Sequence, residues 1–550
     1  MMSKLIVRNG IVFDPMNKIE GEKKDILIEN GVIVEKFSNR TDIKEIDANN
    51  KTDIPAAIDI HSHIASQEIN WVRLIGSKDK LFQDTWKGLT LRNIAKQYIK
   101  NGYTFVLDAN ILPSMAKHAV FNLNNLPVID SGFLLNVSNL WPLELEFQKG
   151  MVKQASAFLS NLLSITKGFG LKVYNPFESE NWNYQKTRED LNQAGRLYNF
   201  KPIDIYENLT KYAEHLGLPH SIHAHVEGYE NPNGQKNLMI VLNRIKSLGL
   251  QSKTVDEKNK RSQIFHLAHG SSYNVDGDNT ELIQLFNDNV NFDLDLGFVA
   301  FDPVNPLITN DRILINSLQN SSPDYKIFRS AIEFEGDTYS TLRKFDKNNK
   351  IHCNLWNNAI ELALSIKNKW QIQLSCNFPN YSNISNIPKI ATWLMSQKTR
   401  DEFSSNFNIK SHNSPNNSIT FNEFVIISRS SPSKSLGIGN HKGNLEVGAD
   451  ADINILNLNL TNIDVEKNHQ VLEKELANIE FVIKGGKIIK KGDNIDLNSK
   501  GKIFWASGKT EEGEDKFILS KKRDYYQKYY SIFYDTLKVP ENEELFRKIL

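Results

Sequence analysis

The chain begins with short runs in which hydrophobic and polar residues alternate, which is the pattern of a half-buried β-strand. Residues 5–13 and 25–34 each carry such a run around an Asn-Gly pair, the strongest short signal for a hairpin turn. A third hairpin is predicted near the other end, at residues 481–489, and residues 448–456 predict a turn that leads into a strand. Because an isolated hairpin cannot bury its apolar face, we predict one small β domain built from both ends of the chain.

Between these β-rich ends, strand-like runs alternate with helical patterns. The strand-like runs are residues 103–108, 169–174, 221–225, 263–267, 290–295 and 372–376, and helical patterns such as 204–216 and 356–366 lie between them. This alternation predicts parallel β/α units, and the length suits a (β/α)₈ barrel with insertions. The expected fold class is α/β, a TIM barrel with a small composite β-sandwich domain.

The predicted domain boundaries follow from these patterns. A chain of 550 residues is too long for one hydrophobic core. Residues 1–55 and 425–510 are assigned to the β domain and residues 56–424 to the barrel. Residues 511–550 form a C-terminal helical extension, whose cluster of aromatic residues favours a contact with another subunit.

Composition and charge narrow the class of protein. Hydrophobic residues make up 40% of the chain and charged residues 24%, as in soluble globular proteins. The 66 Lys and Arg are balanced by 65 Asp and Glu, so no excess positive charge is available to bind nucleic acid. Neither a signal peptide nor an apolar run of membrane-spanning length is found. With only two cysteines, Cys353 and Cys376, the chain is expected to be cytoplasmic and free of membrane partners.

Two motifs in the barrel region carry candidate chemistry. His61 and His63 lie two residues apart in a strand-like run, so both imidazoles project from one face, as zinc ligands do. Lys172 lies among apolar and small residues of a predicted strand, where a buried ammonium is costly. Carbamylation by CO₂ would turn its amine into a carboxylate that bridges two metals. Taken alone, each motif is more often structural: two satisfied histidines, or a lysine that reaches solvent at a strand end.

More histidines follow in the next predicted strands. His223 and His225 share one strand face, and His225 is nearest the carboxyl end, where barrel active sites lie. His266 lies in the following strand, and His269 comes just after it. The order His-x-His, Lys, His, His, each near the end of a successive strand, favours one shared metal site over unrelated structural positions.

These motifs together resemble those of the amidohydrolase superfamily of metal-dependent hydrolases, and the resemblance covers nearly the whole chain. Residues 442–452 resemble the strand with which that family returns to its β domain. A narrower resemblance is to the A subunits of formylmethanofuran dehydrogenase and of the formyltransferase/hydrolase complex of methylotrophic bacteria. It rests on residues 58–65 with Asn70 and Arg73, 127–135 and 218–225.

The resemblance implies a substrate, a cofactor and partners. It implies hydrolysis of an N-formyl methanofuran-type cofactor to formate and free amine in one-carbon metabolism, within a complex of several subunits. It implies one or two zinc ions, bridged by carbamylated Lys172 if two, which polarise the formamide and lower the pKa of water. The implied metal ligands are His61, His63, Lys172, His225 and His266. Asn70 and Arg73 are the candidate cofactor-binding residues.

One departure from the family pattern bears on activity. The family's eighth-strand motif is Thr-Asp-His-Pro-Asn, and residues 376–380 read Cys-Asn-Phe-Pro-Asn, so Asn377 stands at the position of the catalytic aspartate. An amide cannot act as a general base at neutral pH. Other candidates for the base are His269, Asp295, Asp59 and Glu227.

Three hypotheses therefore stay open. The chain is a hydrolase subunit, with another base or with one zinc and slow hydrolysis. Alternatively, it is a catalytically impaired scaffold that organises a formyltransferase partner. The third hypothesis is a hydantoinase-like ring amidase, against which the narrower motifs count.

Overall fold

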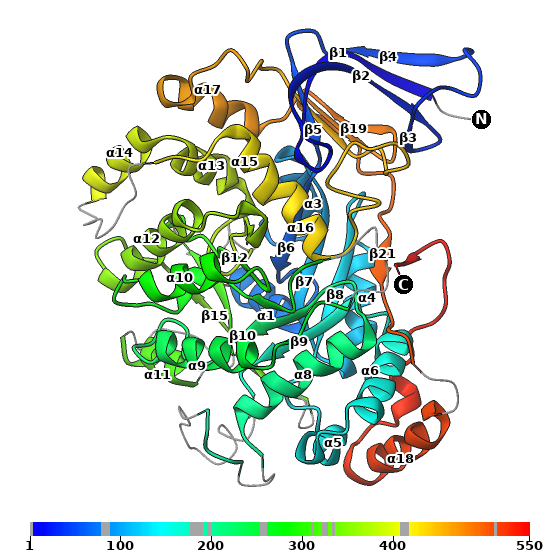
Figure 1. Ribbon diagram of the computed structural model, residues 1–550, viewed down its shortest axis with the longest axis vertical. Coiled ribbons are helices and arrows are strands. Elements are labelled where there is room, and N and C mark those ends of the chain that lie inside the picture. The colour runs from blue at the N-terminus through cyan, green and yellow to red at the C-terminus, as the bar shows by residue number, and fades with distance from the viewer. Residues whose placement is uncertain are drawn as a thin grey trace.

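The computed structural model describes residues 4–78, 88–176, 191–195, 200–253, 261–302, 304–309, 312–321, 328–332, 336–407, 417–510 and 514–549. In Figure 1 a β-rich domain lies above a central barrel, and the C-terminal helix α18 (Glu514–Tyr529) lies at the opposite end.

The β domain is one nine-stranded sheet drawn from both ends of the chain, as predicted. Its order is β20-β19-β18-β17-β5-β1-β2-β3, with β4 beside β1. The antiparallel pair β5–β17 joins the two halves, with Ile54 opposite Asn454. The bounds are β1 (Lys4–Asp14), β2 (Ile19–Glu29), β3 (Val32–Val34), β4 (Ile43–Asp47), β5 (Thr52–Pro55), β17 (Ile453–Leu456), β18 (Phe481–Lys484), β19 (Lys487–Lys491) and β20 (Asn494–Ile495).

Eight parallel strands form the barrel in chain order, which confirms the predicted fold class. They are β6 (Ala57–Ser62), β7 (Tyr103–Ile111), β8 (Asp130–Asn136), β9 (Gly170–Tyr174), β10 (Ile222–His225), β11 (Phe265–Leu267), β12 (Phe292–Asp295) and β16 (Ile372–Gln373). The ring is closed just beyond β16, where the His63 amide donates to the Phe378 carbonyl at 2.7 Å and Ser62 bridges to Phe378.

Helices surround the barrel and bury their apolar faces against it (Figure 1). Helix α8, for example, starts with Pro202 at its first turn and ends at Gly217, whose φ of 61° allows the chain to leave the helix. The barrel helices are α1 (Gln67–Lys78), α3 (Leu91–Lys100), α4 (Ala116–Asn124), α5 (Glu144–Lys149), α6 (Val152–Thr166), α8 (Pro202–Leu216), α9 (Gly234–Ser247), α10 (Thr280–Asp288), α11 (Arg312–Ser321), α12 (Lys350–Ser365), α13 (Ile387–Met395) and α14 (Gln397–Phe407).

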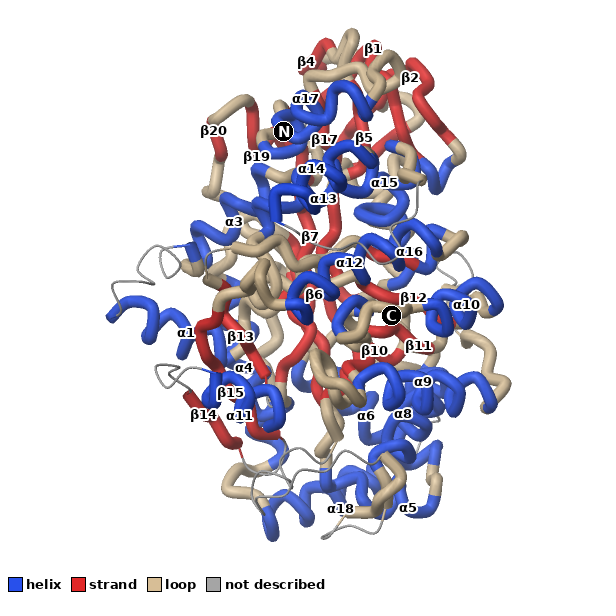
Figure 2. Tube along the Cα trace, turned by 90° about the vertical axis from the view of Figure 1, so that its left-hand side faces the viewer, coloured by secondary structure: helices blue, strands red, loops and turns tan. Residues whose placement is uncertain are grey.

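Two further segments shape the carboxyl and amino ends of the barrel. After β12, the antiparallel strands β13 (Asn305–Thr309), β15 (Gly336–Arg343) and β14 (Phe328–Ile332) form a small sheet that packs against α1 (Figure 2). Thr309 in this sheet accepts a hydrogen bond from Tyr174 at the end of β9, at 3.1 Å. After α14, the helices α15 (Phe421–Val425) and α16 (Ser431–Ser435) flank a π-helical turn, and α17 (Val465–Ala477) connects β17 to β18.

The C-terminal part differs from the predicted boundaries. Strand β21 (Ile503–Trp505), expected in the β domain, pairs instead with β8 of the barrel. Residues 514–549 contain the expected helix α18, which packs on α6, but they end in β22 (Phe546–Lys548), a parallel neighbour of β21. The extension is therefore tied to the barrel at both its start and its end.

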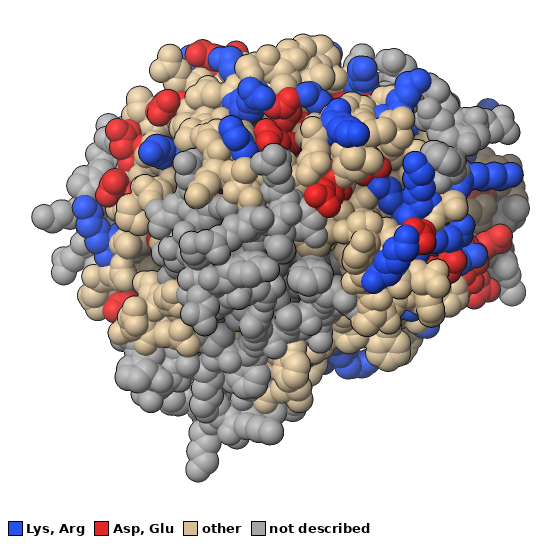
Figure 3. Space-filling model, turned by 90° about the horizontal axis from the view of Figure 1, so that it is seen from below, with Lys and Arg blue, Asp and Glu red and all other residues tan. Residues whose placement is uncertain are grey.

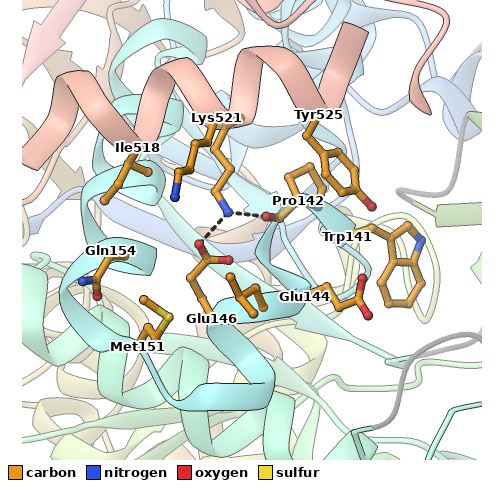
Figure 4. A pocket seen from close by; sticks show the side chains of 11 residues that line it. Trp141, Pro142, Glu144, Glu146, Met151, Gln154, Ile518, Lys521 and Tyr525 are labelled. Carbon is orange, nitrogen blue, oxygen red and sulfur yellow. Dashed lines mark hydrogen bonds and ion pairs between the residues drawn. The ribbon is translucent and has the colours of Figure 1, made fainter. Parts of the chain in front are cut away.

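Beside α18 lies a cavity of about 530 Å³, lined by residues of α5, α6 and α18 (Figure 4). The buried Lys522 ammonium crosses one side of it and contacts Glu146 at 2.6 Å. Trp141, Met151, Ile518 and Tyr525 supply apolar lining, and no histidine lines it. On the lower end of the molecule, basic and acidic side chains are interspersed where the structure describes them (Figure 3).

Candidate metal centre

Successive barrel strands bring the predicted site residues to one end of the barrel. His61 lies near the end of β6, and His63 comes just after that strand. Lys172 lies in β9, His225 ends β10, and Asp295 ends β12. His266 lies in β11, and His269 follows that strand by two residues. All of these side chains are buried. The structure thus brings together residues that lie more than two hundred positions apart.

The histidines form two layers along the barrel axis. Cα pairing aligns Lys172, His223 and His266 across adjacent strands, and Asp293 continues the same row. His225 comes two residues later on β10, so it lies nearer the carboxyl end of the barrel. His220 lies beside His223 in the lower layer. We call His220, His223 and His266 the lower cluster, and we call His61, His63, His225 and His269 the upper cluster.

Three pairs of rings in the upper cluster have centroid distances that suit imidazoles around a metal. Ring centroids are 5.3 Å apart for His61 and His63, 5.4 Å for His61 and His269, and 4.7 Å for His225 and His269. Imidazoles bound tetrahedrally to zinc at about 2.1 Å have centroids about 5 Å apart. His63 Nδ1 and His225 Nε2 are buried without a hydrogen-bond partner. Buried nitrogens of this kind fit a metal-binding role.

Protonation in the upper cluster also suits metal binding. Burial lowers the pKa of His61, His63, His225 and His269, so these rings are neutral at pH 7 and offer lone pairs. Burial also lowers the pKa of Lys172 to about 7, although Asp295 and Asp108 partly oppose this shift. A large fraction of the Lys172 amine is therefore uncharged at neutral pH, which is the form that reacts with CO₂.

His266, a predicted ligand, has different surroundings. Its Nδ1 lies 3.0 Å from Asp293 Oδ1 and its Nε2 lies 3.3 Å from Asp295 Oδ2. Burial alone would lower the pKa of His266, but the two carboxylates outweigh it and raise the pKa to about 9. Both nitrogens of His266 thus lie within reach of a carboxylate, and its role as a metal ligand stays a prediction. After β11, His269 is the histidine whose ring joins the upper cluster.

Asp295, a predicted catalytic residue, is held as an anion by several donors. Its Oδ2 accepts from His61 Nδ1 at 3.0 Å and from the His269 amide at 3.0 Å, while its Oδ1 accepts from the Ser375 hydroxyl. Burial would raise the pKa of Asp295, but its histidine partners outweigh it and hold the pKa well below the ordinary value. Such a carboxylate orients His61 and is a poor general base.

Asn377 and Asp59 are also placed by the structure. Asn377 adopts a φ of 44° just after β16, next to the Phe378 carbonyl that binds the His63 amide, and its Oδ1 is buried without a hydrogen-bond partner. Asp59 accepts from the Tyr98 hydroxyl of α3 at 2.6 Å, and burial raises its pKa to about 7. The hydrogen bond from Tyr98 thus connects Asp59 to helix α3.

Asn70 and Arg73 form a separate network on α1. Arg73 Nη1 donates to Asn70 Oδ1 at 2.5 Å, and its Nε donates to the Leu89 carbonyl at 2.6 Å. Asn70 Nδ2 lies 2.6 Å from His118 Nε2 of α4. The structure brings these residues together with each other, and Arg73 Nη2 also donates to the carbonyl of Ile64, the residue after His63, at 3.5 Å. Cofactor binding by this pair stays a prediction.

Four tyrosines that the sequence did not indicate line the upper cluster. Tyr174 and Tyr229 lie 4.3 Å and 4.4 Å from His225 between ring centroids. Tyr273 is parallel to His269 at 6.0 Å, and Tyr381 lies 5.5 Å from it. They come from four separate loops or strands, so no local sequence pattern marks them.

His223 was also not predicted as a site residue, although it shares a strand face with His225. Among the described residues, two groups have donor atoms within 4.8 Å of one another: His220, His223 and His266, and His61, His223 and Asp295. Nitrogens bound tetrahedrally to one zinc lie about 3.4 Å apart. The contacts of His223 with His220 and His61 are both 3.1 Å, a hydrogen-bond distance.

Comparisons with known proteins agree with this fold. The amidohydrolase family model matches residues 350–490. In the crystal structure of the formyltransferase/hydrolase complex of Methylorubrum extorquens with methylofuran, one chain matches with a TM-score of 0.85 and 21% identity over 99% of both chains. The chain therefore has the amidohydrolase fold, a (β/α)₈ barrel with a composite β domain.

Two relatives match this chain over nearly their full length. Protein FwdA of Methanocaldococcus jannaschii is 28% identical over 96% of this chain and 95% of its own length. The A subunit of the formyltransferase/hydrolase complex of M. extorquens is 22% identical over 97% of this chain and 96% of its own. The chain resembles these two proteins along nearly its entire length, which confirms the predicted resemblance. None of the helices among the described residues is long and apolar enough to cross a membrane.

Proposed function

We propose that this protein is the zinc-dependent hydrolase subunit of a cytoplasmic complex like the formyltransferase/hydrolase complex. It would hydrolyse the N-formyl group of a methanofuran-type amine to formate and free amine in one-carbon metabolism. The similarity to two nearly full-length relatives supports this, as does the methylofuran bound in the related complex. The observation that carries the proposal is the upper cluster, where four neutral imidazoles lie close together and His63 Nδ1 and His225 Nε2 are buried without hydrogen-bond partners.

We assign the metal ligands as His61, His63, Lys172, His225 and His269. This set keeps four of the five residues predicted from the sequence and replaces His266 with His269. Carbamylated Lys172 would bridge two ions. When bound, zinc supplies Lewis acidity, which polarises a carbonyl group and makes hydroxide available at neutral pH.

The chain's own residues would orient the formamide and exclude water. The Oδ1 atoms of Asn377 and Asn380 are buried without hydrogen-bond partners and can accept the formamide N–H. The rings of the four tyrosines pack against His225 and His269. The hydroxyl groups of Tyr174 and Tyr229 bond to Thr309 and so connect these rings to the small β13–β15 sheet.

A second candidate function is a scaffold subunit with impaired catalysis. Asn377 cannot take a proton, and Asp295 is an anion already held by its donors. Neither residue is then a good general base, which would slow hydrolysis.

We also propose that the C-terminal extension contacts another subunit of the complex. Tyr529 and Phe533 are 62% and 63% exposed, which is unusual for such large side chains on a helix and the turn after it. Aromatic residues are enriched at protein interfaces.

Metal analysis and formate release test the proposed function. The purified complex should contain about one to two zinc ions per copy of this chain and release formate from the N-formyl substrate. The variant His61→Ala with His63→Ala should lose zinc and activity together. Zinc at full occupancy without formate release would favour the scaffold, and absence of zinc from a folded native chain would contradict both versions of the metal site.

A further inference from the structure

The lower cluster connects the backbone of α16 to a proposed metal ligand through a line of hydrogen bonds. His220 Nδ1 lies 2.9 Å from the Ser435 carbonyl oxygen. His220 Nε2 lies 3.1 Å from His223 Nδ1, and His223 Nε2 lies 3.1 Å from His61 Nδ1. His220 and His223 are fully buried, so solvent does not interrupt this line.

The chemistry of the first link fixes the direction of all the others. A backbone carbonyl only accepts, so His220 carries its hydrogen on Nδ1. Burial lowers the pKa of His220 to about 3, so the ring is neutral and its Nε2 is an acceptor. His223 must then donate from Nδ1, which leaves its Nε2 to accept from His61 Nδ1. Each ring carries one hydrogen, always on Nδ1.

The end of the line decides which nitrogen of His61 can bind a metal. With its hydrogen on Nδ1, His61 presents the lone pair of Nε2. We propose that His220 and His223 are positioning residues that fix the tautomer of His61 from the backbone of α16, so that its Nε2 is available to zinc. This inference rests on the proposed function only in naming His61 as a ligand.

Asp295 also accepts the His61 Nδ1 hydrogen, so the role of the histidine line must be separated from that of the carboxylate. Asp295 attracts a proton to Nδ1 but does not prevent His223 from turning its own proton toward His61. If His223 adopted its other tautomer, its Nε2–H would face His61 Nδ1 and compete with the bond to Asp295. His220 prevents this because its Nε2 has no hydrogen and needs one from His223.

The test compares two substitutions at one buried position. His220→Leu removes the acceptor for His223, whereas His220→Gln can still donate to Ser435 and accept from His223 through its amide. Zinc affinity of the full chain is measured by chelator competition with zinc alone. The expected result is a loss of about 10- to 100-fold in H220L, as for other residues that orient metal-bound histidines, with H220Q close to native. The Co²⁺-substituted protein should show an altered visible spectrum in H220L alone.

A second pair of variants keeps the test decisive if H220L does not fold. His223→Gln can donate to His220 and accept from His61, and should retain zinc, whereas His223→Leu should weaken it. If the two residues act in one line, the H220L/H223L double variant should bind zinc no more weakly than H223L.

Three outcomes would overturn the inference. Equal zinc affinity in native, H220L and H223L chains would show that Asp295 suffices. Equal losses in Leu and Gln variants would show that the histidines matter only for packing or as ligands. Loss of one full zinc equivalent in H220L, with the affinity of the remaining sites unchanged, would make the lower cluster a metal site itself. A folded native chain without any zinc affinity would contradict the proposed function as well, whereas the first three outcomes leave it standing.

Discussion

Asp295 ends β12, and Asn377 lies just after β16, the next strand of the barrel. The two side chains differ in whether their oxygen atoms already accept hydrogen bonds. Asp295 has its lone pairs occupied by hydrogen bonds from His61, His269 and Ser375. Asn377 Oδ1 is buried with no hydrogen bond and lies beside the backbone that binds His63. At position 377 the buried, unpartnered oxygen therefore belongs to an amide, which cannot take up a proton.

Replacing Asn377 with Asp should restore a proton acceptor at this position. General acid–base catalysis contributes roughly 10²–10⁴-fold, so formate release by N377D should rise by about 10²-fold or more if the base alone is missing. The measurement is the initial rate of formate release by the assembled complex. Asn422→Asp is the matched control, because Asn422 of α15 also has a buried, unpartnered Oδ1 but lies outside the proposed site, and it should not raise the rate. An unchanged rate in N377D with zinc retained would favour the scaffold.

At the scale of elements, the segment before β17 joins the barrel to the β domain through buried charges. Lys442 Nζ lies 2.7 Å from Asp130 of β8 and 2.6 Å from Asp452, and the side chain is only 2% exposed. Lys484 of β18 also contacts Asp130, at 2.8 Å. Burial would raise the pKa of Asp130, but Lys442 and Lys484 together hold it well below its ordinary value.

Lys442→Met should destabilise the protein by about 3–5 kcal/mol near pH 7, because it leaves buried carboxylates short of a counter-charge. A carboxyl group with a depressed pKa stabilises the fold above its unfolded-state pKa, near 4, and loses that contribution as pH falls. The deficit of K442M should therefore shrink as pH is lowered below about 4, where the carboxylates bind protons. Urea unfolding at several pH values measures this. Lys398→Met, at an exposed pair with Glu402, should change stability by less than about 0.5 kcal/mol.

At the scale of the whole molecule, the C-terminal extension has some aromatic side chains buried in the core and others exposed on the surface. Tyr526 and Tyr534 are buried, and the ring of Tyr534 lies 5.6 Å from Phe158 of α6. Tyr529 and Phe533, close to them in sequence, are exposed. One short segment thus carries aromatic side chains with two distinct roles.

The double variant Tyr529→Ser with Phe533→Ser should keep the stability of the isolated chain and weaken its association with the other subunits. Removing two exposed rings costs little in folding but removes apolar contacts from the proposed interface. Co-purification of the tagged chain with its partners, beside its thermal midpoint, separates the two effects. Tyr526→Ser should instead lower stability by about 3 kcal/mol or more, since that ring is buried. Full assembly by the double variant would place the interface elsewhere.

Much of this architecture could be predicted because it depends on local patterns. The hairpins around Asn-Gly pairs and the alternation of strands and helices follow from neighbouring residues, and strand period put His61 beside His63. The predicted boundary places residues 503–505 in the β domain, whereas strand β21 pairs with the barrel, because a three-residue strand carries no sign of its partner. Likewise, the choice between His266 and His269 could not be made from spacing, since both follow the same strand.

The sequence by itself determined the order of elements and the kinds of side chain that reach the end of the barrel, because both depend on period and residue type. Only the tertiary structure decided what each group can do there. Two aspartates from β12 raise the pKa of His266 to about 9, and the Ser435 carbonyl of α16 lies within hydrogen-bond distance of His220. The protonation of a buried group depends on its neighbours in space, and those neighbours come from distant parts of the chain.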